Sequence, residues 1–194
     1  MPQPHIILAS SSPYRKELLS RILDDFDAIS PDIDETPFPD EEPIELVARL
    51  AQQKALAIAV NHPDALVIGS DQVCVLDKQI LGKPGTMDKA IEQLQACSGQ
   101  TVTFYTSLCV TSAHETAQST TVVVTKVHFR SLNNIEIISY LEKEQPFDCA
   151  GSFKCEGLGI VLFEAIESKD PTALIGLPLI ALATKLRELD VELI

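Results

Sequence analysis

The segment His5-Ile6-Ile7-Leu8-Ala9-Ser10-Ser11-Ser12-Pro13 combines an apolar run with a polar turn near the start of the chain. A short apolar run bounded by turn residues is typical of a buried strand, which we expect over residues 5–9. The serines and Pro13 predict a loop and the beginning of a helix, from Tyr14 to about Leu23. A strand, a loop and a helix in this order form the repeating unit of an α/β protein.

The rest of the chain continues this alternation. Further helices are expected from Pro43 to about Val60, from Thr86 to about Cys97, from Asn134 to about Lys143 and from Asp170, the last one interrupted by Gly176 and Pro178. Further strands are expected at Leu66–Ile68, Val102–Thr111, Thr120–Phe129 and Ile160–Phe163, with a hairpin that turns at Asp77-Lys78. With no internal repeat or linker, the sequence predicts one α/β domain over residues 1–194, with a mixed twisted sheet flanked by helices.

Composition limits the classes of partner. The 194 residues are 45% hydrophobic and carry a formal net charge of −13, so the protein as a whole repels nucleic acid. A free nucleoside triphosphate is also repelled, so phosphate chemistry would need local basic residues or a bound cation. Five cysteines without a C-x-x-C pair argue against a disulfide framework or a zinc site. With no apolar run of membrane-spanning length and no signal-peptide core, we expect a cytoplasmic protein without a membrane partner.

Polar groups follow two of the predicted strands. Ser10 to Ser12 come after the first strand, and Ser70-Asp71 come after Leu66–Ile68. If these strands are parallel, both groups lie at one edge of the sheet, where ligands of α/β proteins bind. The serines also begin a helix with Arg15 one turn in, which suits an anion. Capping of that helix by Ser12 explains the same residues equally well.

Two lysines stand out by position. Lys54 follows Val47 by seven residues and precedes Ile58 by four, which places it inside the apolar stripe of its helix. It either extends to a buried partner or packs its stem on the core and reaches water. Lys83 precedes Pro84, which favours an extended backbone and a projecting side chain. An exposed loop lysine of this kind is commonly only solvated.

Acidic residues stand at two places that could carry chemistry. Asp71 follows an apolar strand and a glycine, so its carboxylate should emerge at an edge of the sheet, although an aspartate here could also cap a turn. Asp32, Asp34 and Glu35 lie on a loop flanked by prolines and could supply oxygen ligands to Mg²⁺ or Mn²⁺. Such a loop could equally face water.

Several short motifs together resemble those of the Maf-type nucleotide pyrophosphatases. They are Leu8-Ala9-Ser10-Ser11-Ser12-Pro13-Tyr14-Arg15, Asp34-Glu35-Thr36-Pro37, Gly69-Ser70-Asp71-Gln72, Gly82-Lys83-Pro84, Ala150-Gly151-Ser152-Phe153-Lys154-Cys155-Glu156-Gly157 and Gly176-Leu177-Pro178. The resemblance covers nearly the whole chain. It implies an α/β fold like that of inosine-triphosphate pyrophosphatases, with two lobes around a cleft, often in a homodimer. It also implies hydrolysis of a nucleoside triphosphate to its monophosphate and pyrophosphate, with a divalent cation.

The resemblance also implies roles for individual residues. Asp71 corresponds to the catalytic aspartate that activates water, and Glu35 to the metal-site residue. The substrate-binding positions fall on Ser10, Arg15, Lys54 and Lys83.

Substrate choice is indicated by Tyr14, Gln72 and Glu156. They are similar to the branch of the family that acts on 7-methyl-GTP, although that branch often has Trp where Tyr14 stands. Because 7-methylguanine is cationic, an aromatic face and a carboxylate both favour it. Three alternatives stay open: a dTTP or UTP pyrophosphatase of the same family, a nucleotide-binding regulator of septum formation, and an acidic interaction module.

Overall fold

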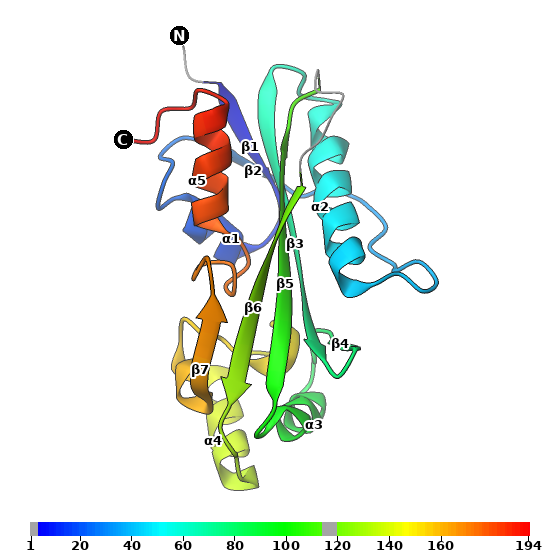
Figure 1. Ribbon diagram of the computed structural model, residues 1–194, viewed down its shortest axis with the longest axis vertical. Coiled ribbons are helices and arrows are strands. Elements are labelled where there is room, and N and C mark those ends of the chain that lie inside the picture. Colours follow the sequence, from blue (N-terminus) through cyan, green and yellow to red (C-terminus); the bar gives the residue numbers. More distant parts are fainter. Residues whose placement is uncertain (1–3, 114–119) are drawn as a thin grey trace. The chain divides into compact units, whose positions relative to one another are not determined.

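The computed structural model describes residues 4–113 and 120–194 (Figure 1). Its strands are β1 (His5–Ala9), β2 (Asp27–Ile29), β3 (Ala65–Leu76), β4 (Gln79–Leu81), β5 (Thr101–Thr111), β6 (Thr120–Phe129) and β7 (Phe163–Ser168). Its α-helices are α1 (Pro13–Leu19), α2 (Pro43–Ala59), α3 (Met87–Cys97), α4 (Asn134–Glu144) and α5 (Leu179–Glu188). Two short 3₁₀ helices are η1 (Ala150–Ser152) and η2 (Leu158–Leu162).

The described strands form one seven-stranded sheet in the order β2-β1-β3-β5-β6-β7, with β4 paired to β3. β1 lies parallel to both β2 and β3, with Ile7 opposite Asp27 on one side and Val67 on the other. β4 and β7 pair antiparallel with β3 and β6, respectively. The predicted mixed α/β sheet is therefore confirmed.

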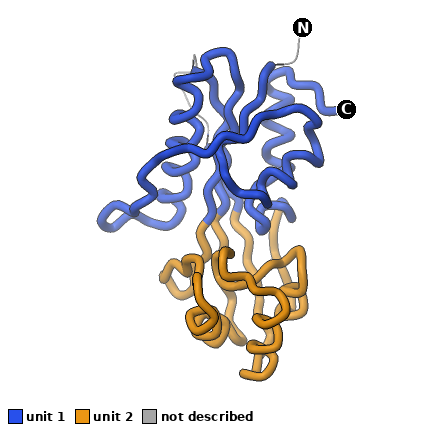
Figure 2. The backbone as a smooth tube through the Cα atoms, turned by 180° about the vertical axis from the view of Figure 1, so that it is seen from behind, with its two compact units in different colours: residues 1–72, 106–123, 170–194 blue, residues 73–105, 124–169 orange. Residues whose placement is uncertain are grey.

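The chain divides into two compact units, coloured separately in Figure 2. Unit 1 comprises Met1–Gln72, Thr106–Val123 and Asp170–Ile194, and unit 2 comprises Val73–Tyr105 and Val124–Lys169. The boundaries between the units fall within β3, β5 and β6, so each of these strands contributes residues to both units.

Unit 1 is built in three layers. Alternate residues of β1 face opposite ways, as the period of a strand requires, and each set joins its own core. One core contains Ile6, Leu8, Leu18, Leu19, Leu182 and Leu186, and so joins β1 to α1 and α5. The other contains Ile7, Ala9, Ala51, Ala55 and Ile58, and so joins β1 to α2. Figure 1 accordingly shows α2 and α5 on opposite sides of these strands. The apolar run at the start of the chain is thus covered on both faces.

Unit 2 has an aromatic core. Phe153 makes edge-to-face contacts with Phe104, Phe129 and Phe163, with ring centroids 4.8–5.5 Å apart. This geometry suits the ring quadrupoles. Phe153 lies just after η1, where Gly151 has φ +76° and a Cβ would come 3.0 Å from the sulfur of Cys74. The glycine-rich segment around η1 therefore packs closely on the sheet.

Several local predictions are confirmed. Ser12 and Thr86 cap α1 and α3 by accepting from the amides of Arg15 and Lys89. The hairpin turns at Asp77 and Lys78, whose φ angles of 45° and 73° are typical of a tight two-residue turn. Helix α1, however, ends at Leu19 rather than near Leu23.

Three further predicted elements were wrong in part. The strand predicted at Leu66–Ile68 does not end before Gly69, because β3 continues through Asp71 to Leu76. Residues 160–162 belong to η2, and the strand begins only at Phe163. The last helix begins at Leu179, after the break that Gly176 and Pro178 impose.

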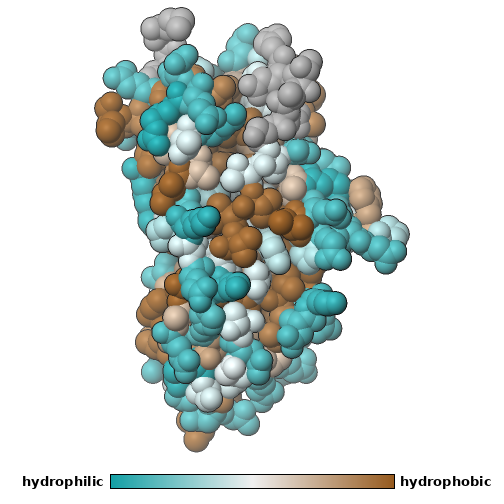
Figure 3. Space-filling model, viewed as in Figure 1, coloured by the Kyte–Doolittle hydropathy of each residue, from teal (hydrophilic) through white to brown (hydrophobic). Residues whose placement is uncertain are grey.

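Within residues 4–113 and 120–194, no helix has both the length and the apolar character needed to cross a membrane. Hydrophilic side chains are spread over the face drawn in Figure 3, with apolar ones exposed among them. All five cysteines lie among the described residues, and none of them forms a disulfide.

Candidate active site

Gly69 allows helix α2 to lie directly on β3. A Cβ at this position would come 2.1 Å from the Ala51 carbonyl oxygen and 2.9 Å from the Ala55 Cβ. Because the first of these is a backbone atom, no side-chain adjustment could relieve the overlap. Glycine is therefore required for this close approach. The approach brings Lys54, on the same turn of α2 as Ala55, to the polar residues that follow Gly69 in β3.

Lys54 forms a buried ion pair with Asp71. Its Nζ donates to Asp71 Oδ1 at 2.6 Å, and the two side chains are only 7% and 9% exposed. The same ammonium lies 2.9 Å from Glu35 Oε1. Of the two readings of Lys54, the one in which its ammonium reaches water is therefore wrong: the side chain ends between two carboxylates.

The backbone of β3 at Asp71 is held by the side chain of Ser107, a residue that the sequence did not indicate. Ser107, in β5, accepts from the Asp71 amide at 3.1 Å and donates to the Val47 carbonyl of α2 at 2.6 Å. A serine within an apolar strand gives no sequence signal for this role. Its buried hydroxyl nevertheless joins three elements of unit 1 around the carboxylate.

Arg15 enters the same group of residues from α1. Its Nε donates to the Gly176 carbonyl at 2.8 Å, and its Nη1 lies 3.5 Å from Ser10 Oγ. Ser70 Oγ donates to the same carbonyl at 3.0 Å. The predicted meeting of the Ser10 and Ser70-Asp71 groups is thus observed, although Ser70 and Asp71 lie inside β3 rather than after its end. Ser12 serves as the cap, while Ser10 Oγ also accepts from the Ser12 amide at 3.1 Å, and its role toward a ligand stays a prediction.

Burial shifts the pKa values of both Asp71 and Arg15. Burial raises the pKa of Asp71, against the opposing effect of the Lys54 and Arg15 cations and despite the Lys54 hydrogen bond, while Glu35 adds to the rise. Burial lowers the pKa of Arg15, against the effect of Asp71 and Glu35, but an arginine remains charged at neutral pH. A carboxylate with a raised pKa is a stronger base than a solvated one.

The acidic loop, residues 30–42, places Glu35 beside this pair. Asp34 does not share that position: its Oδ1 accepts from the Thr36 amide at 2.9 Å and so shapes the loop. Hydrogen bonds with the side chain and then the backbone of Thr36 lower the pKa of Asp34. For Asp32, a part in the site stays a prediction.

Gln72 follows Asp71, and hydrogen bonds from its side-chain amide nitrogen hold it in place. Nε2 lies 2.9 Å from Thr106 Oγ1, 2.8 Å from the Ala173 carbonyl and 3.1 Å from that of Leu174. Tyr14 is half-buried in the first turn of α1. Lys83 and Glu156 belong to unit 2, where both are exposed, so their roles stay predictions.

Unit 1 thus combines an α/β layer structure with a buried carboxylate, two basic side chains and a second carboxylate on a loop. These features define an α/β protein with a site suited to anionic, phosphate-bearing ligands and to acid–base chemistry.

Comparison with known proteins agrees with this class. The family model for Maf-like proteins matches residues 5–189, and the chain belongs to that family. It is 54% identical to the 7-methyl-GTP pyrophosphatase of Aliivibrio fischeri over 186 residues, which are 96% of each chain. It is 55% identical to the enzyme of the same name from Cupriavidus metallidurans over 185 residues, 95% of this chain and 93% of that one. A HAM1 protein from Coxiella burnetii shares the fold, with a TM-score of 0.53, 16% identity and coverage of 95% and 99% of the two chains.

Proposed function

We propose that the protein hydrolyses 7-methyl-GTP to 7-methyl-GMP and pyrophosphate. The observation that carries the proposal is the buried Lys54–Asp71 ion pair beside Arg15, which combines a base with two cations in one place. The names of relatives more than 50% identical over nearly their whole length support the choice of reaction and substrate.

A divalent cation, Mg²⁺ or Mn²⁺, is the proposed cofactor. Within the part of the chain that the structure describes, no cluster of three or more His, Cys, Asp or Glu could hold a metal ion. Glu35 and Asp71, however, both reach the Lys54 ammonium, so their oxygens converge on one cation already. Mg²⁺ is commonly held by one or two carboxylates together with substrate phosphates, and these residues fit that pattern. When bound, the metal would neutralise charge on the phosphate oxygens.

The chain's own residues supply the rest of the proposed reaction. Asp71 takes a proton from the water whose oxygen attacks the α-phosphorus. The bond from that phosphorus to the oxygen bridging the α- and β-phosphates breaks, and pyrophosphate leaves with the bonding electrons. Lys54 and Arg15 neutralise the phosphate chain, with Lys83 proposed as a third cation and Ser10 as a hydroxyl partner.

Base recognition is proposed for Tyr14, Gln72 and Glu156. The ring of Tyr14 and the carboxylate of Glu156 would favour a cationic base. The Gln72 amide nitrogen already donates to backbone carbonyls, which leaves its carbonyl oxygen as the group to face a ligand. Gln72 would therefore recognise a donor, such as an N–H group of guanine.

We further propose a cytoplasmic location and a homodimer. Five cysteines with no disulfide among them suit a reducing compartment. Size-exclusion chromatography with light scattering would test the dimer.

A substrate panel tests the proposed function. Released pyrophosphate is measured with 7-methyl-GTP, GTP, UTP and dTTP, each with Mg²⁺, with Mn²⁺ and with EDTA. We expect the highest kcat/KM for 7-methyl-GTP and loss of turnover in EDTA. Preference for UTP or dTTP would move the protein to the pyrimidine branch. Tight nucleotide binding without pyrophosphate release would instead favour the regulator.

A further inference from the structure

We infer that Arg49 is a positioning residue that fastens the acidic loop to α2 and thereby holds Glu35 at Lys54. The inference rests on the proposed function, since it gives Arg49 a part in the same site. The pKa of Arg49 is raised most by its hydrogen bond with Glu41 and least by the charge of Asp71. Among the described residues Arg49 forms no hydrogen bond with Asp71 or Lys54, so we assign its effect to Glu35.

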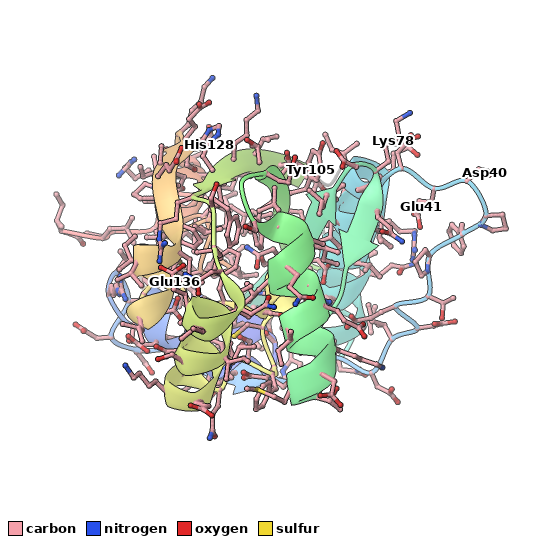
Figure 4. All side chains as sticks on the ribbon, turned by 90° about the horizontal axis from the view of Figure 1, so that it is seen from below. Asp40, Glu41, Lys78, Tyr105, His128 and Glu136 are labelled. Atoms are coloured by element: carbon pink, nitrogen blue, oxygen red, sulfur yellow. The ribbon has the colours of Figure 1, made fainter. Side chains whose placement is uncertain are left out.

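The anchor is a bidentate ion pair between Arg49 and Glu41. Arg49 Nε lies 2.6 Å from Glu41 Oε1, and Nη2 lies 2.8 Å from Oε2. The side chains are 17% and 7% exposed, so water competes little for these contacts. The hydrogen bond from Arg49 lowers the pKa of Glu41 to about 2, so the pair is ionised throughout the physiological range. Figure 4 labels Glu41 on the loop, next to Asp40 at its outer end.

Arg49 also holds the part of the loop nearest Glu35. Its Nη2 donates to the carbonyl of Thr36, the residue after Glu35, at 3.1 Å. Its guanidinium carbon lies 4.1 Å from the centre of the Phe38 ring, a cation–π contact for a side chain that is 58% exposed. One side chain therefore contacts the acidic loop at three separate residues.

The loop is braced internally by the same carboxylate. Glu41 Oε2 accepts from the Phe38 amide at 3.0 Å while it also accepts from Arg49. The same guanidinium group is oriented by Gln53, whose Oε1 accepts from Nη1 at 3.0 Å. Gln53 immediately precedes Lys54, so the loop is tied to the turn of α2 that carries the ammonium.

Glu35 needs such support. Its side chain is 58% exposed, so packing contributes little to its placement, whereas its partner Lys54 is 7% exposed and fixed. Because the ion pair at 2.9 Å requires the loop backbone to stay close to α2, an anchor on the following residues controls where this carboxylate lies.

The test combines Arg49→Lys with Glu35→Gln. Lysine keeps the charge but cannot form the paired contacts or stack as a guanidinium does. We expect Arg49→Lys to raise the Mg²⁺ concentration for half-maximal pyrophosphate release by roughly tenfold, with a smaller change in kcat at saturating Mg²⁺. In the Glu35→Gln background, Arg49→Lys should add little further effect. Additive effects of the two substitutions would overturn the inference, because Arg49 would then act independently of Glu35.

Hydrogen exchange supplies a readout that does not need turnover. The amides of Thr36 and Phe38, bonded to Asp34 and Glu41, should exchange roughly tenfold faster in Arg49→Lys and also in Glu41→Gln, which keeps the size of the side chain. Unchanged exchange in both variants would overturn the inference.

Arg130→Lys is the matched control. Arg130 pairs with Glu136 at 2.7 Å and donates to the Val161 carbonyl, but it lies in unit 2. Arg130→Lys should alter neither the Mg²⁺ concentration for half-maximal pyrophosphate release nor hydrogen exchange in the acidic loop. Effects equal to those of Arg49→Lys would also count against the inference. If the wild-type protein releases no pyrophosphate, the proposed function fails, and the exchange experiment still decides whether Arg49 anchors the loop.

Discussion

Lys54 Nζ and Asp71 Oδ1 lie 2.6 Å apart, in side chains that are both less than a tenth exposed. Burying two charges costs free energy, and an apolar pair of similar volume would often be at least as stable. The ion pair is therefore poor evidence for a purely structural role. A site that must keep a base and a phosphate-binding cation together explains it better, and the following predictions depend on this relationship.

Replacement of Asp71 by Asn should lower kcat by about 10²–10⁴-fold, the usual contribution of a general base. Asparagine keeps the shape and can still accept from Lys54, so the protein should remain folded. Pyrophosphate release and a thermal melt measure the two properties. Turnover near the wild-type rate would remove Asp71 from the mechanism.

Replacement of Lys54 by Met should move the acid limb of the pH profile of kcat/KM to higher pH. Burial raises the pKa of Asp71, and the Lys54 cation opposes that rise. Without the cation the pKa rises further, and the ionised base forms only at higher pH. Residual activity across pH measures the limb, with Lys126→Met, at an exposed position of β6, as the control. A limb that stays in place or moves to lower pH would contradict the assignment.

Replacement of Gly69 by Ala should lower the free energy of unfolding by about 1–3 kcal/mol, as overpacking of a close contact does. The added methyl would meet the Ala51 carbonyl, so α2 must shift and carry Lys54 with it. Activity should fall together with stability. Chemical denaturation compares this variant with Gly82→Ala, where an added Cβ meets nothing within 4 Å. Equal stability of the two variants would refute the argument.

Replacement of Glu156 by Gln should lower kcat/KM for 7-methyl-GTP by roughly tenfold more than kcat/KM for GTP, because only the methylated base is cationic. Glu164→Gln, at an exposed position of β7, removes the same charge elsewhere in unit 2 and should leave the ratio unchanged. Equal losses for both nucleotides would assign Glu156 a role other than selection of the base.

The elements that the sequence predicts well are those with local signals. The apolar run of β1, the caps at Ser12 and Thr86 and the turn at Asp77-Lys78 each depend on neighbouring residues only. β3 was predicted too short because Gly69-Ser70-Asp71 has the composition of a turn. Its strand conformation depends on distant partners: Ser107 for the Asp71 amide and the Gly176 carbonyl for the Ser70 hydroxyl.

The same distinction holds for the site. The position of Lys54 in an apolar helix stripe left two readings open, a buried partner or an ammonium in water, and the structure shows the first. The contribution of Arg49 could not be predicted, since neither its helix position nor the spacing to Glu41 distinguishes it from a solvated surface arginine. Only the folded loop shows that its guanidinium meets Thr36, Phe38 and Glu41 together.

The Gly176 carbonyl accepts from Arg15 and from Ser70, residues that lie 161 and 106 positions earlier in the chain. During synthesis Arg15 and Ser70 leave the ribosome long before Gly176 is added to the chain. The nascent polypeptide can therefore form α1 early, but Arg15 acquires its carbonyl partner only after Gly176 has been added. Catalytic competence should accordingly wait for that residue, and a ribosome stalled before Gly176 would hold a chain that has not completed its site.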